Sequence, residues 1–166
     1  MQMKETCLRR RERGTIPRVQ SQDGTRPMSE KKTPRDPAAG RHHVEVVAGA
    51  IARDGTYLLC RRPGGSNMEG HWEFPGGKVK EGETQEEALR RELEEELGIE
   101  VLVAGHLSTV EYSYPHLDIT LHLFSCPSFE GEPRKLYHSA IAWVRGAEID
   151  RDSLVPSNLP FLDILP

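Results

Sequence analysis

The sequence predicts an α/β fold in which a central mixed sheet carries helices on its faces. Three observations lead to this prediction. Two β-rich segments joined by a tight turn open the domain, one long amphipathic helix lies in its middle, and further β-rich segments precede the C-terminus. Strands and helices in this order favour a layered α/β domain over an all-helical or all-β one.

The first two strands are expected in residues 43–63, HVEVVAGAIARDGTYLLCRRP. Their apolar runs lie on either side of Asp54-Gly55, a favoured pair for the tight turn of a β-hairpin. The polar stretch GGSNMEGH, residues 64–71, is expected to be a loop. It leads into WEFPGGKV, residues 72–79, which is expected to be extended.

One helix is expected from Thr84 to Gly98. Thr84-Gln85-Glu86-Glu87 matches a capping box, which marks a helix N-terminus. Gly98 suits the left-handed residue that ends many helices. The buried stripe is expected at every fourth position, at Leu89, Leu93 and Leu97.

The second half of the domain is expected to hold a hairpin, a further strand and a closing helix. Residues 99–114 and 117–129 form two long β-rich segments around Pro115. EGEPRKLYH, residues 130–138, is expected to be a loop, and SAIAWVRG, residues 139–146, a strand. PSNLPFLDILP, residues 156–166, is expected to close the domain as a short helix.

Composition divides the chain at about residue 41. Residues 1–41 hold 11 Lys and Arg against 5 Asp and Glu, whereas residues 42–166 hold 11 against 21. The first part is also rich in Pro, Gly, Ser and Gln, which is typical of a disordered extension. We therefore expect a basic, disordered extension at 1–41, with Met28 as an alternative start, and one domain at 42–166.

Cysteine usage and hydropathy indicate a cytoplasmic protein with no membrane contact. The three cysteines, Cys7, Cys60 and Cys126, have no metal-ligand or redox spacing, which favours free thiols in a reducing compartment. No apolar run is long enough to span a membrane, and the N-terminus lacks the apolar stretch of a signal peptide.

The last turns of the expected helix carry an unusual concentration of negative charge. A helix C-terminus favours basic side chains, yet Glu94, Glu95 and Glu96 lie there. Glu92, Glu95 and Glu96 share one face at i,i+3 and i,i+4 spacing, where like charges repel. A solvated acidic face with arginine partners is one interpretation. Because Glu92 and Glu96 flank the leucine stripe, the spacing favours divalent cations, Mg²⁺ or Mn²⁺, held together with a phosphorylated ligand.

A set of residues in and around this helix recurs at the spacing of a known motif: Gly77, Glu83, Arg91, Glu92, Leu93, Glu95, Glu96, Gly98 and Ile99. On these residues the segment resembles the Nudix hydrolase family. The resemblance covers about residues 43–164. It implies an α/β/α sandwich with a central mixed sheet, and Mg²⁺-dependent hydrolysis of a nucleoside diphosphate linked to another group.

By position in that motif, the resemblance implies a role for each polar residue. Glu92, Glu95 and Glu96 are the metal ligands, and the carbonyl of Gly76 often joins them. Arg91 would orient the glutamates. Glu83 would support the metal ligands without binding the metal itself.

The flanking segments are RRP (61–63), WEFPGGKVKEGET (72–84), EYSYPHLDITLHLF (111–124), EGEP (130–133) and PSNLP (156–160). Together they resemble the MutT-type members, which cleave 8-oxo-dGTP to 8-oxo-dGMP and pyrophosphate and so remove oxidised nucleotides from the pool. That resemblance implies that Asn158 pairs with the base, that Phe74 lies against it, and that Arg62 contacts the nucleotide. Tyr114 and Asn67 are weaker candidates for substrate contact. The implied partner is a nucleoside triphosphate, with no polymeric nucleic acid required, and the protein is expected to be a monomer or homodimer.

One position departs from the MutT-type pattern. Tyr137 stands where these members usually carry a glutamate that binds metal or acts as the base, with His138 beside it. The general base is therefore open among Glu92, His138 and a metal-bound hydroxide.

WEFPGGKV and AIAWV also occur in pyrophosphohydrolases of CTP and modified pyrimidines, which is the alternative substrate class. A hydrolase of broader specificity and a non-catalytic binding module are two further interpretations, although the intact motif disfavours the binding module.

Overall fold

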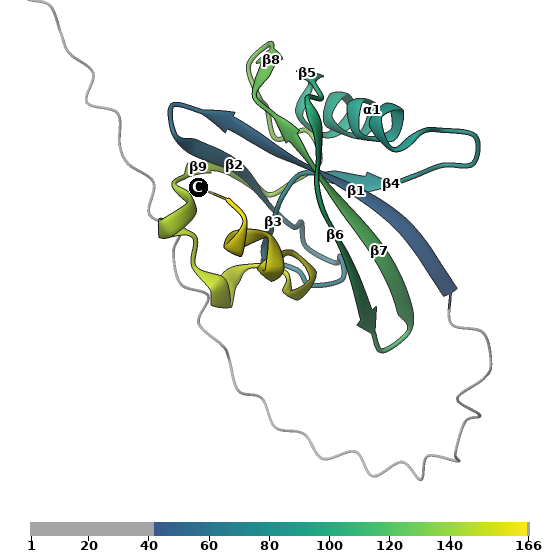
Figure 1. Ribbon diagram of the computed structural model, residues 1–166. Helices are drawn as coiled ribbons and strands as arrows, with labels where there is room; N and C mark the ends of the chain where they lie inside the picture. Colours follow the sequence, from purple (N-terminus) through teal and green to yellow (C-terminus); the bar gives the residue numbers. More distant parts are fainter. Residues whose placement is uncertain (1–41, 166) are drawn as a thin grey trace, which may run out of the picture.

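The computed structural model describes residues 42–165 of the 166-residue chain (Figure 1). The expectations for residues 1–41, including the extension, Cys7 and the alternative start at Met28, lie outside the described residues. No helix in the part of the chain that is described is both long and apolar enough to cross a membrane.

A mixed sheet of seven strands forms the centre of the domain, and a two-stranded sheet lies beside it. In the large sheet the order is β3-β2-β1-β7-β6, with β4 also paired to β1 and β9 to β2. The elements are β1 (His42–Arg53), β2 (Thr56–Arg61), β3 (Trp72–Glu73), β4 (Gly76–Lys78), α1 (Gln85–Leu97), β5 (Glu100–Leu102), β6 (Gly105–Tyr114), β7 (Leu117–Cys126), β8 (Ser128–Glu130), β9 (Ala140–Val144) and the 3₁₀ segments η1 (Gly146–Glu148), η2 (Arg151–Ser153) and η3 (Pro156–Asp163).

Strand β1 changes partner along one of its edges. Its other edge runs parallel to β7 over ten residue pairs, from His42 to Ile51. On the changing edge, Val46–Ala48 pair with β4 and Ala52–Arg53 pair with β2, both antiparallel. Between them the N–H of Gly49 donates to the carbonyl of Pro75 at 2.9 Å. The segment before β4 therefore enters the middle of the sheet, where β2 and β4 diverge.

Helix α1 has the ends and the buried face that the sequence predicts. The Thr84 hydroxyl accepts from the N–H of Glu87, and the Glu87 side chain accepts from the N–H of Thr84, which confirms the capping box. Gly98 has a φ of 68° and ends the helix in the left-handed conformation. The three leucines at every fourth position are fully buried.

Hydrophobic clusters on both faces of the sheet make the domain an α/β/α sandwich. One cluster packs α1 against β1, β2 and β7, and the other packs the opposite face against η3 (Figure 1). Phe161 of η3 is fully buried in the second cluster. The closing segment is helical as predicted, but it is a 3₁₀ helix. Pro160 inside it has no N–H for an α-helical bond.

Three of the expected strands are interrupted. The segment 99–114 divides into β5, which pairs with β8, and β6, which pairs with β7. The segment 117–129 divides at Pro127 into β7 and the start of β8. Between them, the N–H of Ala104 donates to the carbonyl of Ser125. The segment 72–79 also divides in two at Phe74-Pro75, because proline has no N–H to contribute to a ladder.

Candidate active site

The glycines of the motif allow α1 to lie directly on β4. A Cβ atom at Gly77 would overlap the carboxyl group of Glu92. At Gly76, where φ is 152°, it would overlap the carbonyl oxygen of Val47 in β1. A side chain at either position would therefore push the helix or the neighbouring strand away, and the acidic face of α1 would no longer border the strand.

Arg91 connects the loop before α1 with the acidic face of the helix. Its guanidinium donates to both carboxylate oxygens of Glu83, at 2.6 and 2.9 Å, and to Glu92 at 2.7 Å. It also donates to the carbonyl of Lys78 in β4 at 3.0 Å. The hydrogen bonds from Arg91 lower the pKa of Glu83 to about 2, and Glu83 in turn raises the pKa of Arg91. Arg91 and Glu83 thus lie together beside Glu92, and their orienting and supporting roles stay predictions.

The three glutamates of the motif have different surroundings. Glu95 is exposed, with Arg91 at 3.6 Å and Lys80 at 3.7 Å. Glu92 is largely buried and held by Arg91. The Glu96 side chain is only 13% exposed, and its Oε2 has no hydrogen-bond partner.

Glu96 is the electrostatically strained member of the set. Burial, together with the negative charges of Glu92 and Glu73, raises its pKa to about 8, against a hydrogen bond from the N–H of Gly76. An ionised, buried carboxylate with an unpartnered oxygen needs a cation or a proton. This is the feature of the site that fits a divalent metal ion.

The side chains do not form a closed metal cage by themselves. Within residues 42–165, no three His, Cys, Asp or Glu side chains lie close enough together to hold one ion. Mg²⁺ commonly takes only one or two carboxylates and completes its shell with water and substrate phosphates. The donor set of Glu92, Glu96 and the adjacent backbone of Gly76 suits that mode. Glu95 lies at the exposed side of the same cleft.

The loop before β9 closes the C-terminal end of α1, which has no basic residue in its last turn. The N–H of Arg134 donates to the carbonyl of Leu97 at 2.9 Å, and that of Leu136 donates to the carbonyl of Glu96 at 3.0 Å. These backbone donors satisfy helix carbonyls that would otherwise lack partners. The loop also places Tyr137, which is exposed, at the cleft, and turns His138 inward beside Glu96.

A second cavity adjoins the acidic cleft and contains the residues expected to bind the base. Arg62, Glu73, Gly76 and Val46 line both spaces, so the two are continuous. The structure thus brings all five substrate-contact candidates to one cavity. They are Arg62, Asn67, Phe74, Tyr114 and Asn158.

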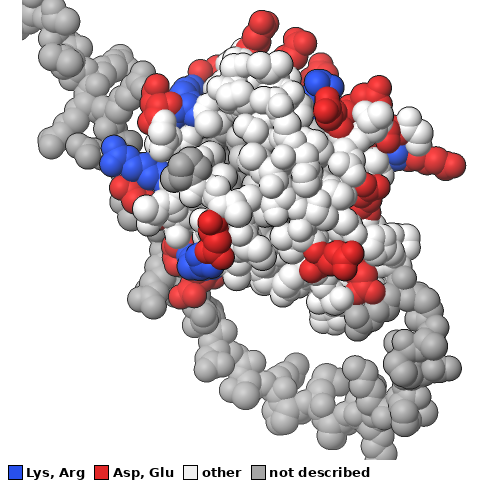
Figure 2. Space-filling view, viewed as in Figure 1, with Lys and Arg blue, Asp and Glu red and all other residues white. Residues whose placement is uncertain are grey.

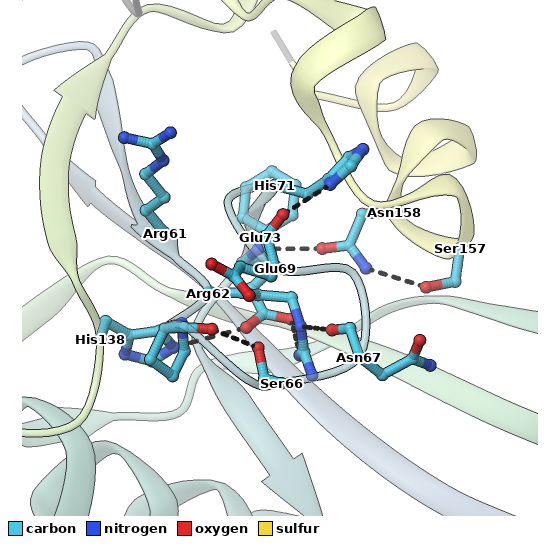
Figure 3. A network of polar contacts seen from close by, with 12 residues as sticks. Arg61, Arg62, Ser66, Asn67, Glu69, His71, Glu73, His138, Ser157 and Asn158 are labelled. Carbon is cyan, nitrogen blue, oxygen red and sulfur yellow. Dashed lines mark hydrogen bonds and ion pairs between the residues drawn. The ribbon is translucent and has the colours of Figure 1, made fainter. Parts of the chain in front are cut away.

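The Asn158 side chain is held in the wall of this cavity by hydrogen bonds. Its Oδ1 accepts from the backbone N–H of Phe74 at 2.9 Å, and its Nδ2 donates to the Ser157 hydroxyl at 3.3 Å (Figure 3). Tyr114 donates to the same hydroxyl at 3.1 Å. Asn158 therefore holds Phe74 in place, and its acceptor is already in use.

Glu73 is a polar residue of the site that the sequence analysis did not select. Its Oε2 accepts from Arg62 at 2.7 Å, and its Oε1 lies 3.4 Å from His138 Nε2 (Figure 3). Arg62 also donates to the carbonyl of Asn67 at 2.5 Å, which fixes the loop over the cavity. The available signal was the alternation in Trp72-Glu73-Phe74, which turns Glu73 away from its two buried neighbours.

Residues 46–163 match the family model of the NUDIX domain. The chain belongs to the Nudix hydrolase family. This Nudix hydrolase is 41% identical to the CTP pyrophosphohydrolase of Escherichia coli over 120 residues, which cover 72% of the chain and 89% of that relative. It is 36% identical to the 8-oxo-dGTP diphosphatase of Haemophilus influenzae over 116 residues, or 69% of the chain and 85% of the relative.

Comparison with a solved structure agrees with this family assignment and tests the fold. The MutT NUDIX hydrolase from Burkholderia pseudomallei matches with a TM-score of 0.70 at 30% identity, covering 75% of this chain and 99% of that one. The predicted α/β class with a mixed sheet is therefore confirmed. As a Nudix hydrolase the protein acts on pyrophosphate bonds of nucleotides, and dependence on a divalent metal is typical of its family. The relatives differ in the substrates that their names state.

Proposed function

We propose that this Nudix hydrolase cleaves a pyrimidine nucleoside triphosphate, CTP or a modified cytidine triphosphate, to the monophosphate and pyrophosphate. The observation that carries the proposal is the hydrogen bond from the N–H of Phe74 to Asn158 Oδ1. The 8-oxo-dGTP interpretation needs an amide that offers both its donor and its acceptor to the purine edge. One lone pair of the Asn158 oxygen accepts from Phe74, and one Nδ2 hydrogen is donated to Ser157. The side chain therefore keeps a single Nδ2 hydrogen to donate, which suits a single carbonyl such as that of cytosine.

The likeness to the CTP pyrophosphohydrolase of Escherichia coli supports the same choice of substrate. It extends over more of this chain than the likeness to the 8-oxo-dGTP diphosphatase of Haemophilus influenzae. Among the proposed roles, Arg62 contacts the nucleotide and Phe74 packs against its base. Asn158 positions Phe74 and donates to the base.

At the phosphates, we assign cation binding to Glu92, Glu96 and the backbone of Gly76, with Glu95 at the exposed side. A bound Mg²⁺ supplies charge neutralisation at the phosphates and activates water for attack. Arg91, anchored by Glu83, keeps the Glu92 carboxylate in place. His138 is poorly suited as the general base, because its side chain is 1% exposed and its Nε2 faces two carboxylates.

8-oxo-dGTP remains the second candidate substrate. The specific observation in its favour is that Asn158 lines the cavity together with Phe74 and Arg62, in the combination that the MutT-type resemblance implies. For this substrate, Asn158 would have to exchange its bond to Phe74 for bonds to the purine. A role in nucleotide-pool sanitation and mutation avoidance would follow from this activity.

One assay separates the two substrates. Pyrophosphate release from CTP, 5-methyl-dCTP, dGTP and 8-oxo-dGTP is measured side by side with Mg²⁺, for the wild type and for Asn158→Ala. We expect the cytidine nucleotides to have the higher kcat/KM. Because Asn158→Ala leaves the buried N–H of Phe74 without its acceptor, at a cost of about 1–3 kcal/mol, we expect the kcat/KM of every substrate to fall. The cytidine nucleotides, which also lose the bond from Nδ2, should be affected most. A wild-type preference for 8-oxo-dGTP that Asn158→Ala selectively abolishes would contradict the proposal.

A further inference from the structure

A chain of polar contacts joins Arg62, Glu73 and His138 (Figure 3). Arg62 and Glu73 line both the acidic cleft and the base cavity. Arg62 Nη1 lies 2.7 Å from Glu73 Oε2, and Glu73 Oε1 lies 3.4 Å from His138 Nε2. The same nitrogen lies 3.9 Å from Glu96 Oε2. One imidazole nitrogen thus stands between two carboxylates, one from β3 and one from α1.

The contacts of His138 define which nitrogen carries the hydrogen. Both neighbours of Nε2 are carboxylate oxygens, which accept hydrogen bonds. Nδ1 is buried and has no partner, so a hydrogen there would be an unsatisfied buried donor. A hydrogen on Nε2 therefore fits this environment. It has Glu73 Oε1 at 3.4 Å, and Glu96 Oε2 lies farther away at 3.9 Å.

The backbone on either side fixes the imidazole in this position. The N–H of Leu136 is bonded to the end of α1, and the N–H of Ser139 donates to the carbonyl of Arg61 at the end of β2 at 3.0 Å. The ring of Tyr137 packs edge-on against the imidazole, with centroids 5.3 Å apart. His138 therefore has little freedom to move away from either carboxylate.

We propose that His138 is a positioning residue that holds Glu96 ready for a cation and, through Glu73, holds Arg62 at the base cavity. Without the imidazole, the carboxylates of Glu73 and Glu96 would have no donor group between them. Glu96 would then turn away from the cleft, and Glu73 would hold Arg62 less firmly. Only the nucleotide half of this inference rests on the proposed function.

Three substitutions at one position test the role. His138→Gln places an N–H near the position of Nε2, His138→Asn places one near Nδ1, and His138→Leu keeps the bulk without a donor. Mn²⁺ binding to the full-length protein without nucleotide is measured by titration with electron paramagnetic resonance. We expect His138→Leu to weaken Mn²⁺ binding about tenfold, as is usual when a group supporting a metal ligand is lost. We expect His138→Gln to restore most of the affinity and His138→Asn to restore little.

The second measurement is the KM for CTP at saturating Mg²⁺. His138→Leu should raise both this KM and the dissociation constant for Mn²⁺. Arg62→Ala, the matched control, should raise the KM and leave Mn²⁺ binding intact. Thermal unfolding shows which variants fold. If His138→Leu does not fold, the comparison of His138→Gln with His138→Asn still tests the role of the Nε2 hydrogen.

Wild-type Mn²⁺ affinity in His138→Leu, or equal rescue by Asn and Gln, would overturn the proposal. Failure of the wild type to hydrolyse CTP would instead contradict the proposed substrate. It would leave the Mn²⁺ result standing, because that measurement contains no nucleotide.

Discussion

Glu96 shows at the scale of a single residue how the site trades stability for function. Its carboxylate is buried beside Glu92 and Glu73, and one of its oxygens has no partner. A side chain selected only for packing would be apolar here, because an unpaired buried charge destabilises a fold. The fold tolerates the position because the rest of α1 is well capped and buries its leucines completely.

Glu96→Gln should stabilise the metal-free protein near pH 8 while removing most activity. The folded-state pKa of about 8 lies above the ordinary value of 4.5, so the folded protein binds this proton more tightly than the unfolded chain. The free energy of unfolding therefore falls as the pH rises from about 4.5 to 8. One pKa unit is worth about 1.4 kcal/mol, so the gain on substitution is on the order of a few kcal/mol at pH 8.

Thermal unfolding in chelator at several pH values checks this expectation. The gain in Tm from Glu96→Gln should be large at pH 8 and vanish near pH 4. Mg²⁺ should raise the Tm of the wild type but not that of the variant, because only the wild type gains the ligand. A gain that is independent of pH would show that Glu96 is not the titrating group.

The sequence predicted the acidic residues of the site but not how they are held. Local spacing on one helix was sufficient to place Glu92, Glu95 and Glu96 on one face. The contacts of Glu73 with Arg62 and His138 join three segments far apart in the chain, and no local pattern reports such pairing. For the same reason, the bond between Asn158 and Phe74, separated by 84 positions, could not be foreseen.

At the scale of elements, the C-terminal end of α1 and the loop after β8 depend on each other. The loop supplies the donors that the helix carbonyls need, and the helix end fixes the loop that carries His138. The sequence predicted the helix ends, because capping box and glycine are local signals. It did not predict the break between β5 and β6, because that break depends on pairing with β8 and β7.

Gly98→Ala should therefore weaken both the fold and the site. The left-handed conformation at φ 68° costs a residue with a Cβ about 1–2 kcal/mol. The added Cβ would also lie 3.0 Å from the Arg134 guanidinium in the loop. We expect a Tm lower by several degrees and weaker Mn²⁺ binding.

Gly105→Ala is the control for this substitution, because its Cβ would meet nothing within 4 Å. It should leave the Tm and Mn²⁺ binding close to those of the wild type. Equal effects of the two substitutions would show that the junction between helix and loop has no special role.

At the scale of the whole molecule, the charge is unevenly distributed along the chain and over the surface. Residues 42–166 carry the acidic excess, whereas residues 1–41 are basic. On the face drawn in Figure 2, Lys, Arg, Asp and Glu lie around the periphery, and the centre carries none of them.

Both described hydrophobic clusters are built from residues between Val44 and Leu165. The described domain thus contains a sandwich that is closed on both faces of its sheet.

A protein that begins at residue 42 should keep the stability and the activity of the full chain. Strand β1 is paired from His42 onward, where it lies opposite Leu117 of β7, so the truncation removes no described strand pairing. The composition of residues 1–41 also supplies too little apolar surface to offset an ordering cost of about 1–2 kcal/mol per residue.

We expect the Tm and the kcat/KM for CTP to match those of the full chain at moderate salt. Measurement at low salt provides the control, because attraction between the basic segment and the acidic domain would strengthen there. A clear loss of Tm or of kcat/KM at moderate salt would show that residues 1–41 contribute contacts to the domain or to the substrate.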